Sequence, residues 1–232
     1  MGSSHGIRDG MARVGAIGLA MVLAGCAASQ PREAKPSGFL RDYSQLKQGE
    51  SGQALLVYVS PEADFARYTK ILIDPVTIWR DASTSRIPPG EAQILIDDLD
   101  DSLRLALDGE YALVDRPGPD VMRLRVAITE AEGSWHVEDA LGSKLDPELR
   151  AALPKQPSSE TKGFVGKAGI EAEMLDSTTG VRLLAAVDRR AGARRLRPDQ
   201  GSWDDVEAAF DYWTERLRMR LAELRRRAVA RP

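Results

Sequence analysis

A long alternation of apolar and polar residues in the middle of the chain constrains the fold most strongly. In the segment 121–130 the apolar positions on one side are Met122, Leu124, Val126 and Ile128. The polar positions between and after them are Arg123, Arg125 and Thr129. Successive side chains of a β-strand point to opposite faces, so this period predicts a strand with one apolar and one charged face.

Two further alternating segments, 169–176 and 181–189, flank the turn Ser-Thr-Thr-Gly at 177–180 and predict a β-hairpin. We expect its apolar face to consist of Ile170, Ala172, Met174, Val181, Leu183, Ala185 and Val187. The charged face would consist of Glu171, Glu173, Arg182 and Asp188, together with Arg123 and Arg125. The pattern favours an antiparallel sheet whose second face is solvated and carries a ladder of charges. The alternative is that this ladder binds a ligand.

Two segments place apolar residues at intervals of three and four, which is typical of helices with one buried stripe. In the segment 91–107 the stripe consists of Ala92, Ile96, Leu99, Leu103 and Ala106. In the last helix, for which Ser202 is the expected N-cap, it consists of Val206, Phe210, Trp213, Leu217, Leu221 and Leu224. We expect both helices to pack side by side on the sheet. A partner-binding groove or a coiled coil is the alternative for the last helix.

The segment 68–79 predicts a further strand, in which the apolar period changes at the Asp-Pro pair 74–75. A bulge or an edge position at the proline would return both halves to one core face. The apolar residues concerned are Ile71, Ile73, Val76 and Ile78.

Shorter strands are expected at 54–59 and 111–115, and a docking turn is expected around Phe39, Tyr43 and Leu46. The predicted fold class is therefore α/β in the α+β sense. A single domain over 39–232 combines a mostly antiparallel sheet with two main helices packed on one of its faces.

Residues 1–25 are interpreted as a secretory signal peptide. Arg8 and Arg13 precede the uncharged stretch 14–23, as in a basic region followed by an apolar one. A helix of about ten residues rises only about 15 Å, half of the roughly 30 Å hydrocarbon core of a bilayer. The stretch is therefore too short to be a comfortable membrane span.

The end of this stretch, Leu23, Ala24, Gly25 and Cys26, resembles the lipobox of bacterial lipoproteins, which is cleaved before the cysteine. The resemblance implies a diacylglycerol on the Cys26 thiol and a third acyl chain on its amino group, and several chains make a stable anchor. Ala27 replaces the aspartate of the enteric inner-membrane signal, which implies the periplasmic face of the outer membrane. Residues 26–38 then form the lipidated cysteine and a flexible tether. The alternative is a buried cysteine after an ordinary signal peptide.

Composition restricts the available chemistry. Cys26 is the only cysteine, which excludes a disulfide, and the two histidines are His5 and His136. His136 alone is more often structural or exposed than catalytic. The formal net charge of -3 argues against a nucleic-acid binder, and we expect no cofactor and no metal. The acidic run is interpreted as a solvated helix face rather than a cation site: Asp97, Asp98, Asp100 and Asp101.

Five arginines lie between the predicted hairpin and the last helix: Arg189, Arg190, Arg194, Arg195 and Arg197. Guanidinium groups bind phosphates and carboxylates in a forked geometry, so this cluster is a candidate patch for an anionic partner. Lipopolysaccharide phosphates, acidic peptidoglycan stems and acidic protein surfaces are the candidates. The alternative is a solvated loop that balances nearby acids.

Five segments, in order along nearly the whole mature chain, resemble the proteobacterial lipoproteins grouped as domain of unknown function 3313. They are 37–46, 67–79, 111–129, 171–192 and 203–221. The resemblance implies an outer-membrane or periplasmic lipoprotein and assigns neither an activity nor catalytic residues. Cys26 is the residue whose role it carries over.

These observations predict a non-enzymatic binding or envelope-assembly accessory, held at the periplasmic face of the outer membrane by its lipid. Its expected partners are the membrane and an envelope protein or anionic envelope component. A periplasmic hydrolase with a carboxylate-based site is the alternative, because an acid–base pair needs only two carboxylates. Two facing carboxylates in a deep pocket would favour the hydrolase. An apolar or arginine-rimmed surface would favour the binding module.

The lipid anchor leads to a direct prediction. Cys26→Ala removes the acceptor of the acyl chains, so the protein should leave the membrane fraction and lose incorporation of an alkyne-labelled fatty acid. Cell fractionation and gel fluorescence measure both effects. Continued membrane fractionation, or an acylated alanine variant, would contradict the assignment.

Overall fold

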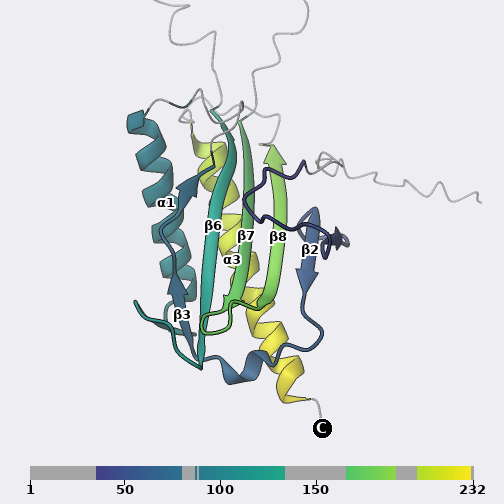
Figure 1. Cartoon of the computed structure of the whole chain (residues 1–232). Helices are drawn as coiled ribbons and strands as arrows, with labels where there is room; N and C mark the ends of the chain where they lie inside the picture. Colours follow the sequence, from purple (N-terminus) through teal and green to yellow (C-terminus); the bar gives the residue numbers. More distant parts are fainter. Residues whose placement is uncertain (1–34, 80–86, 88, 134–165, 192–202, 231–232) are drawn as a thin grey trace, which may run out of the picture.

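The computed structural model describes residues 35–79, 87, 89–133, 166–191 and 203–230 (Figure 1). Within these ranges one 8-stranded sheet has the order β1-β2-β8-β7-β6-β3-β5, and β4 pairs with β6 beside this path. The strands are β1 (Lys47–Gln48), β2 (Leu56–Val59), β3 (Lys70–Ile73), β4 (Thr77–Ile78), β5 (Ala112–Leu113), β6 (Val121–Glu132), β7 (Lys167–Asp176) and β8 (Arg182–Ala191). The helices are the 3-10 turn η1 (Phe65–Arg67), α1 (Pro89–Leu107) and α3 (Asp204–Val229).

The three longest strands confirm the predicted sheet. β6, β7 and β8 pair antiparallel and form its centre, and β2 and β1 extend it antiparallel beyond β8. On the other side β3 and β4 pair parallel with β6, and β5 pairs parallel with β3. Figure 1 shows both long helices on one face of this mostly antiparallel sheet. The predicted fold class is therefore confirmed.

The helix-facing side of the sheet contains the main core. The four apolar residues of β6 pack there with the predicted stripe of α3, of which Leu217 alone is only partly buried. In α1 the fully buried residues are spaced by four: Leu95, Leu99, Leu103 and Leu107. The predicted member Ala106 lies outside this core because a row spaced by four is inclined to the helix axis. None of the described helices is both long enough and apolar enough to span a bilayer.

The strand interrupted at Pro75 shows the predicted bulge. Ile73 lies opposite Leu124, whereas Thr77 lies opposite Ala127, so this strand has one residue more than β6 between the two pairs. The extra residue reverses the alternation. As a result the four apolar residues on both sides of Pro75 reach the same core.

Over β7 and β8 the second face of the sheet is covered, so the prediction that it is solvated is wrong there, whereas Arg123 on β6 is exposed as predicted. Glu171 is 0% exposed and Glu173 is 4% exposed. The N-terminal segment of the described chain crosses this face in front of β7 and β8 (Figure 1). Phe39 and Leu40 are buried against Ala185 and Val187 in a second, smaller core.

A bulge in β8 explains why apolar residues of the hairpin lie on the glutamate face. Met174 pairs with Leu184, but the next residue of β7 pairs with Arg182, which leaves Leu183 as the extra residue. Beyond this bulge the alternation of β8 is reversed. Ala185 and Val187 therefore face the N-terminal segment rather than the helices, and Asp188 contacts α3. Our assignment of these three side chains to faces is wrong for this reason.

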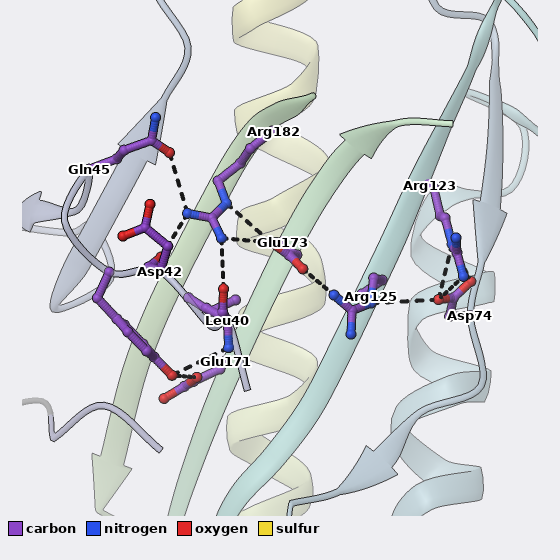
Figure 2. Close-up of polar contacts among 10 residues, drawn as sticks. Leu40, Asp42, Gln45, Asp74, Arg123, Arg125, Glu171, Glu173 and Arg182 are labelled. Atoms are coloured by element: carbon purple, nitrogen blue, oxygen red, sulfur yellow. Dashed lines mark hydrogen bonds and ion pairs between the residues drawn. The ribbon is translucent and has the colours of Figure 1, made fainter. Parts of the chain in front are cut away.

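A network of charges and hydrogen bonds holds the N-terminal segment on the sheet (Figure 2). Glu171 accepts hydrogen bonds from the Tyr43 hydroxyl at 2.6 Å and from the Ser37 amide at 2.7 Å. Glu173 forms ion pairs with Arg125 and Arg182. The Arg182 guanidinium also donates to the carbonyl oxygens of residues 40 and 42, at 2.9 and 2.8 Å. Buried Glu171 thus obtains its partners from a segment that lies more than 100 residues away in the chain, whereas Glu173 is paired with arginines of the two neighbouring strands.

Asp176, at the end of β7, stabilises the turn of the hairpin. It is 3% exposed and accepts hydrogen bonds from the Thr178 and Thr179 amides and the Tyr68 hydroxyl. Burial works to raise the pKa of Asp176, but these hydrogen bonds outweigh it and lower the pKa to about 2. Burial and the bond to Asp176 in turn raise the pKa of Tyr68 to about 12.

Asp176→Asn should therefore destabilise the fold by about 2 kcal/mol at neutral pH, since one pKa unit corresponds to about 1.4 kcal/mol. The lowered pKa means that the carboxylate contributes its stability above pH 4 and loses it as the pH falls toward 2. Urea denaturation at pH 7 and pH 3 measures the difference, which should shrink at the lower pH. Asp108→Asn, at an exposed position after α1, is the control. A loss that does not change with pH would contradict this account.

Candidate functional site

Two helices do not cover the whole sheet on their side. α1 packs against α3 and β4, and α3 packs against α1 and β7. Beyond α3, toward β8 and β2, lies a cavity of about 680 Å³, which we call the α3–β2 cavity. Sites that bury small ligands have volumes of about 300–1,000 Å³, so this cavity is large enough for one.

The floor of the α3–β2 cavity is a row of short side chains across four strands. Val57, Ala186, Ala172 and Val126 are successive partners in the register of β2, β8, β7 and β6. Both alanines lie near the middle of long strands, and yet both are only half-buried. Both alanines line the cavity, which lies above these short side chains.

The walls of the cavity are largely apolar. Trp213 and Leu217 line it from α3, and Leu99 and Leu103 of α1 line it from the core. Asp188 is the charged group among these inner residues and is 3% exposed. One of its oxygens accepts from the Trp213 indole nitrogen at 2.7 Å and the other from the Leu55 amide at 3.1 Å. Asp188 thus holds Trp213 and β2 in place with both oxygens engaged.

The opening of the cavity is rich in arginine. We call Arg216, Arg220, Arg226 and Arg227, all on α3, the arginine rim. Glu223, on the same helix, forms ion pairs with Arg220 and Arg227, and these arginines lower the pKa of Glu223. Arg216 donates to the carbonyl oxygen of Gly52, which joins α3 to the loop before β2. Arg216, Arg220 and Arg227 lie on one flank of α3, beside its apolar stripe, and Arg226 lies next to them near the C-terminal end of the helix.

The predicted arginine cluster is described only at its first two members. Arg189 forms an ion pair with Glu130 inside the sheet. The Arg190 guanidinium lies 3.6 Å from the ring centroid of Tyr212, a residue that lines the α3–β2 cavity. The other predicted site residues lie outside the described residues: Leu23, Ala24, Gly25, Cys26, His136, Arg194, Arg195 and Arg197.

Two aspartates of the acidic run in α1 have partners on the same helix. Asp100 forms an ion pair with Arg104, and Asp97 accepts a hydrogen bond from the side-chain amide of Gln93. Burial, followed by the charges of Asp211 and Asp101, raises the pKa of Asp98. Among the residues that the structure describes, no group of three or more histidine, cysteine, aspartate or glutamate side chains is arranged to hold a metal ion.

The alanines of the cavity floor are the residues that our sequence analysis missed as a site. Ala172 is expected only as one apolar position of an alternating strand, and the alternation expected for the second strand leaves Ala186 off the apolar face. Their small size at the centre of two ten-residue strands is the signal that could have pointed to a hollow. That signal becomes specific only once the register shows that the two alanines are direct neighbours.

Filling this floor tests whether the cavity is open in solution. Ala186→Leu adds a side chain to empty apolar space and should stabilise the domain by about 1–2 kcal/mol. Chemical denaturation measures the change, and Ala208→Leu on the exposed side of α3 is the matched control. A closed, well-packed interior would instead be overpacked by the same substitution and lose about 1–3 kcal/mol, which would contradict the cavity.

The chain is similar to the "Uncharacterized lipoprotein YdcL" of Escherichia coli K12. The two are 25% identical over 190 residues, which cover 78% of this chain and 82% of the relative. This relative supports a lipoprotein role for the chain.

Two solved structures match part of the chain at low sequence identity. The PelC dodecamer from Paraburkholderia phytofirmans matches with a TM-score of 0.40 and 12% identity, over 71% of this chain and 94% of that one. Protein XCC0632 from Xanthomonas campestris matches with a TM-score of 0.41 and 14% identity, over 75% and 94%. The family model described as "Protein of unknown function (DUF3313)" matches residues 35–217, and the chain belongs to this family.

Proposed function

We propose that the protein is a lipoprotein held at the periplasmic face of the outer membrane by acyl chains on Cys26, and that it acts there as a binding module without catalysis. The lipobox-like residues 23–26 and the similarity to a lipoprotein support the anchor. Ala27 supports the outer membrane as its location.

The single observation that carries the binding role is the α3–β2 cavity. It has an apolar floor that is open enough to leave Ala172 and Ala186 half-buried, and an arginine-rich opening. A ligand that covers this floor removes apolar surface from water, which favours binding.

The carboxylates that line the cavity give little support to a hydrolase. Glu223 is neutralised by two arginines, and Asp188 accepts a hydrogen bond at each oxygen. Glu50, in the loop before β2, is the third carboxylate among the lining residues. A general acid–base pair requires two carboxyl groups that face each other across a substrate, and these three have other partners or lie at the opening.

The position of the tether is compatible with an accessible site. Ser37 and Tyr43 bind Glu171 on the face of the sheet opposite the helices. The α3–β2 cavity lies on the helix face. The described chain therefore enters the domain on the face that does not carry the cavity.

A photo-crosslinking amino acid at Met219 tests the binding role in cells. Met219 lines the cavity opening and is 41% exposed, so a benzoylphenylalanine there reaches a bound ligand. Leu105, which is 83% exposed on α1 and does not line the cavity, is the matched control position. We expect ultraviolet-dependent adducts at Met219 that mass spectrometry resolves and that are absent at Leu105.

Absence of adducts at Met219, or the same adducts at both positions, would rule out the cavity as the binding site. Separation of inner and outer membranes on a density gradient tests the location independently. The protein should sediment with the outer membrane, and recovery with the inner membrane would contradict that assignment.

A further inference from the structure

The α3–β2 cavity joins an apolar interior to a positively charged opening. The floor consists of alanine and valine side chains, and the walls include Trp213 and Leu217. The arginine rim lies at the C-terminal half of α3, at one side of this space. A matching occupant has an apolar part that covers the floor and an anionic part that stays at the rim.

The interior is unsuited to an anion. Asp188 is a buried acidic residue in the wall and already uses both oxygens to accept hydrogen bonds. Burying a second anion beside it would add unfavourable electrostatics in a poorly solvated space. The anionic end of the occupant must therefore lie away from Asp188, toward the solvent.

The rim has the complementary charge. Four arginines of α3 line one side of the opening, and the carboxylates among the lining residues there are Glu50 and Glu223. Glu223 is shared between Arg220 and Arg227, and the neighbouring Arg226 is exposed. Guanidinium groups donate in a planar fork that fits the oxygens of a phosphate, so the opening favours a phosphate ester over an uncharged headgroup.

We propose that the α3–β2 cavity binds a single-chain anionic phospholipid, with the acyl chain on the floor formed by Ala172 and Ala186 and the phosphate at the arginine rim. This inference rests on the proposed function, because a membrane-anchored domain has such lipids within its reach. Affinity then grows with chain length, by roughly fourfold for each methylene group that the cavity buries.

Calorimetric titration tests the proposal on the mature chain, residues 26–232 with Cys26→Ala, which contains every described residue. The probe is palmitoyl lysophosphatidylglycerol below its micelle concentration. Monopalmitoylglycerol supplies the same chain without the charge, and glycerol 3-phosphate supplies the headgroup without the chain. We expect the lysophospholipid to bind at least tenfold more tightly than either, and to raise the melting temperature.

Two pairs of variants locate the site. Arg226→Glu at the rim should weaken lysophospholipid binding at least tenfold, whereas Arg116→Glu, on the exposed turn before β6, should leave it unchanged. Ala186→Leu should abolish lysophospholipid binding because it fills the space for the acyl chain, whereas Ala208→Leu should retain binding. Ala172→Leu fills the same floor from β7 and replaces Ala186→Leu if that variant does not fold.

Equal affinity for the uncharged lipid, equal affinity for glycerol 3-phosphate, or no binding by the parent chain would each overturn this inference. A protein adduct at Met219 without lysophospholipid binding would also overturn it, yet would leave the binding role intact. Lysophospholipid binding by a protein that sediments with the inner membrane would instead contradict the proposed location alone.

Discussion

Burial of two glutamates on the central strand β7 is the constraint on which the rest of the structure depends. Glu171 and Glu173 lie on the face of the sheet opposite the helices, and a buried carboxylate without partners is strongly destabilising. Arg125 and Arg182 supply positive charge from the neighbouring strands, and Tyr43 supplies a hydroxyl. The N-terminal segment therefore completes the domain, because it donates hydrogen bonds to Glu171 and covers the face on which both carboxylates are buried.

The two faces of the sheet are filled in different ways. On the glutamate face, a short irregular segment reaches the sheet with Phe39 and Leu40, and the bulge in β8 presents Ala185 and Val187 to it. On the helix face, α1 and α3 lie over the sheet but do not cover its full width. Among the described residues, small side chains lie at the part of the sheet that α1 and α3 do not cover, and the α3–β2 cavity lies above them. The proposed binding site thus lies where α1 and α3 leave part of the sheet uncovered.

Periodicity was enough to predict the long elements. The four apolar residues of β6, the stripe of α3 and the bulge at Pro75 all follow from spacing along one segment. The candidate site did not follow, because its residues come from β2, β7, β8 and α3 and become neighbours only through register and packing. The same limit explains the error on the charged face. The sequence shows that Glu171 and Glu173 share a face, but it does not show that the segment 37–43 packs on that face.

The sequence by itself determined the secondary structure of the central hairpin and the long helices, the α+β class and the expectation of an acylated Cys26. These features are local, since each depends on residues within one or two turns of each other. The tertiary structure decided which carboxylates are buried, which half of β8 faces which layer, and where the sheet is left uncovered. These features depend on a single extra residue at Leu183 and on contacts across more than 100 residues, and local spacing carries no information about either.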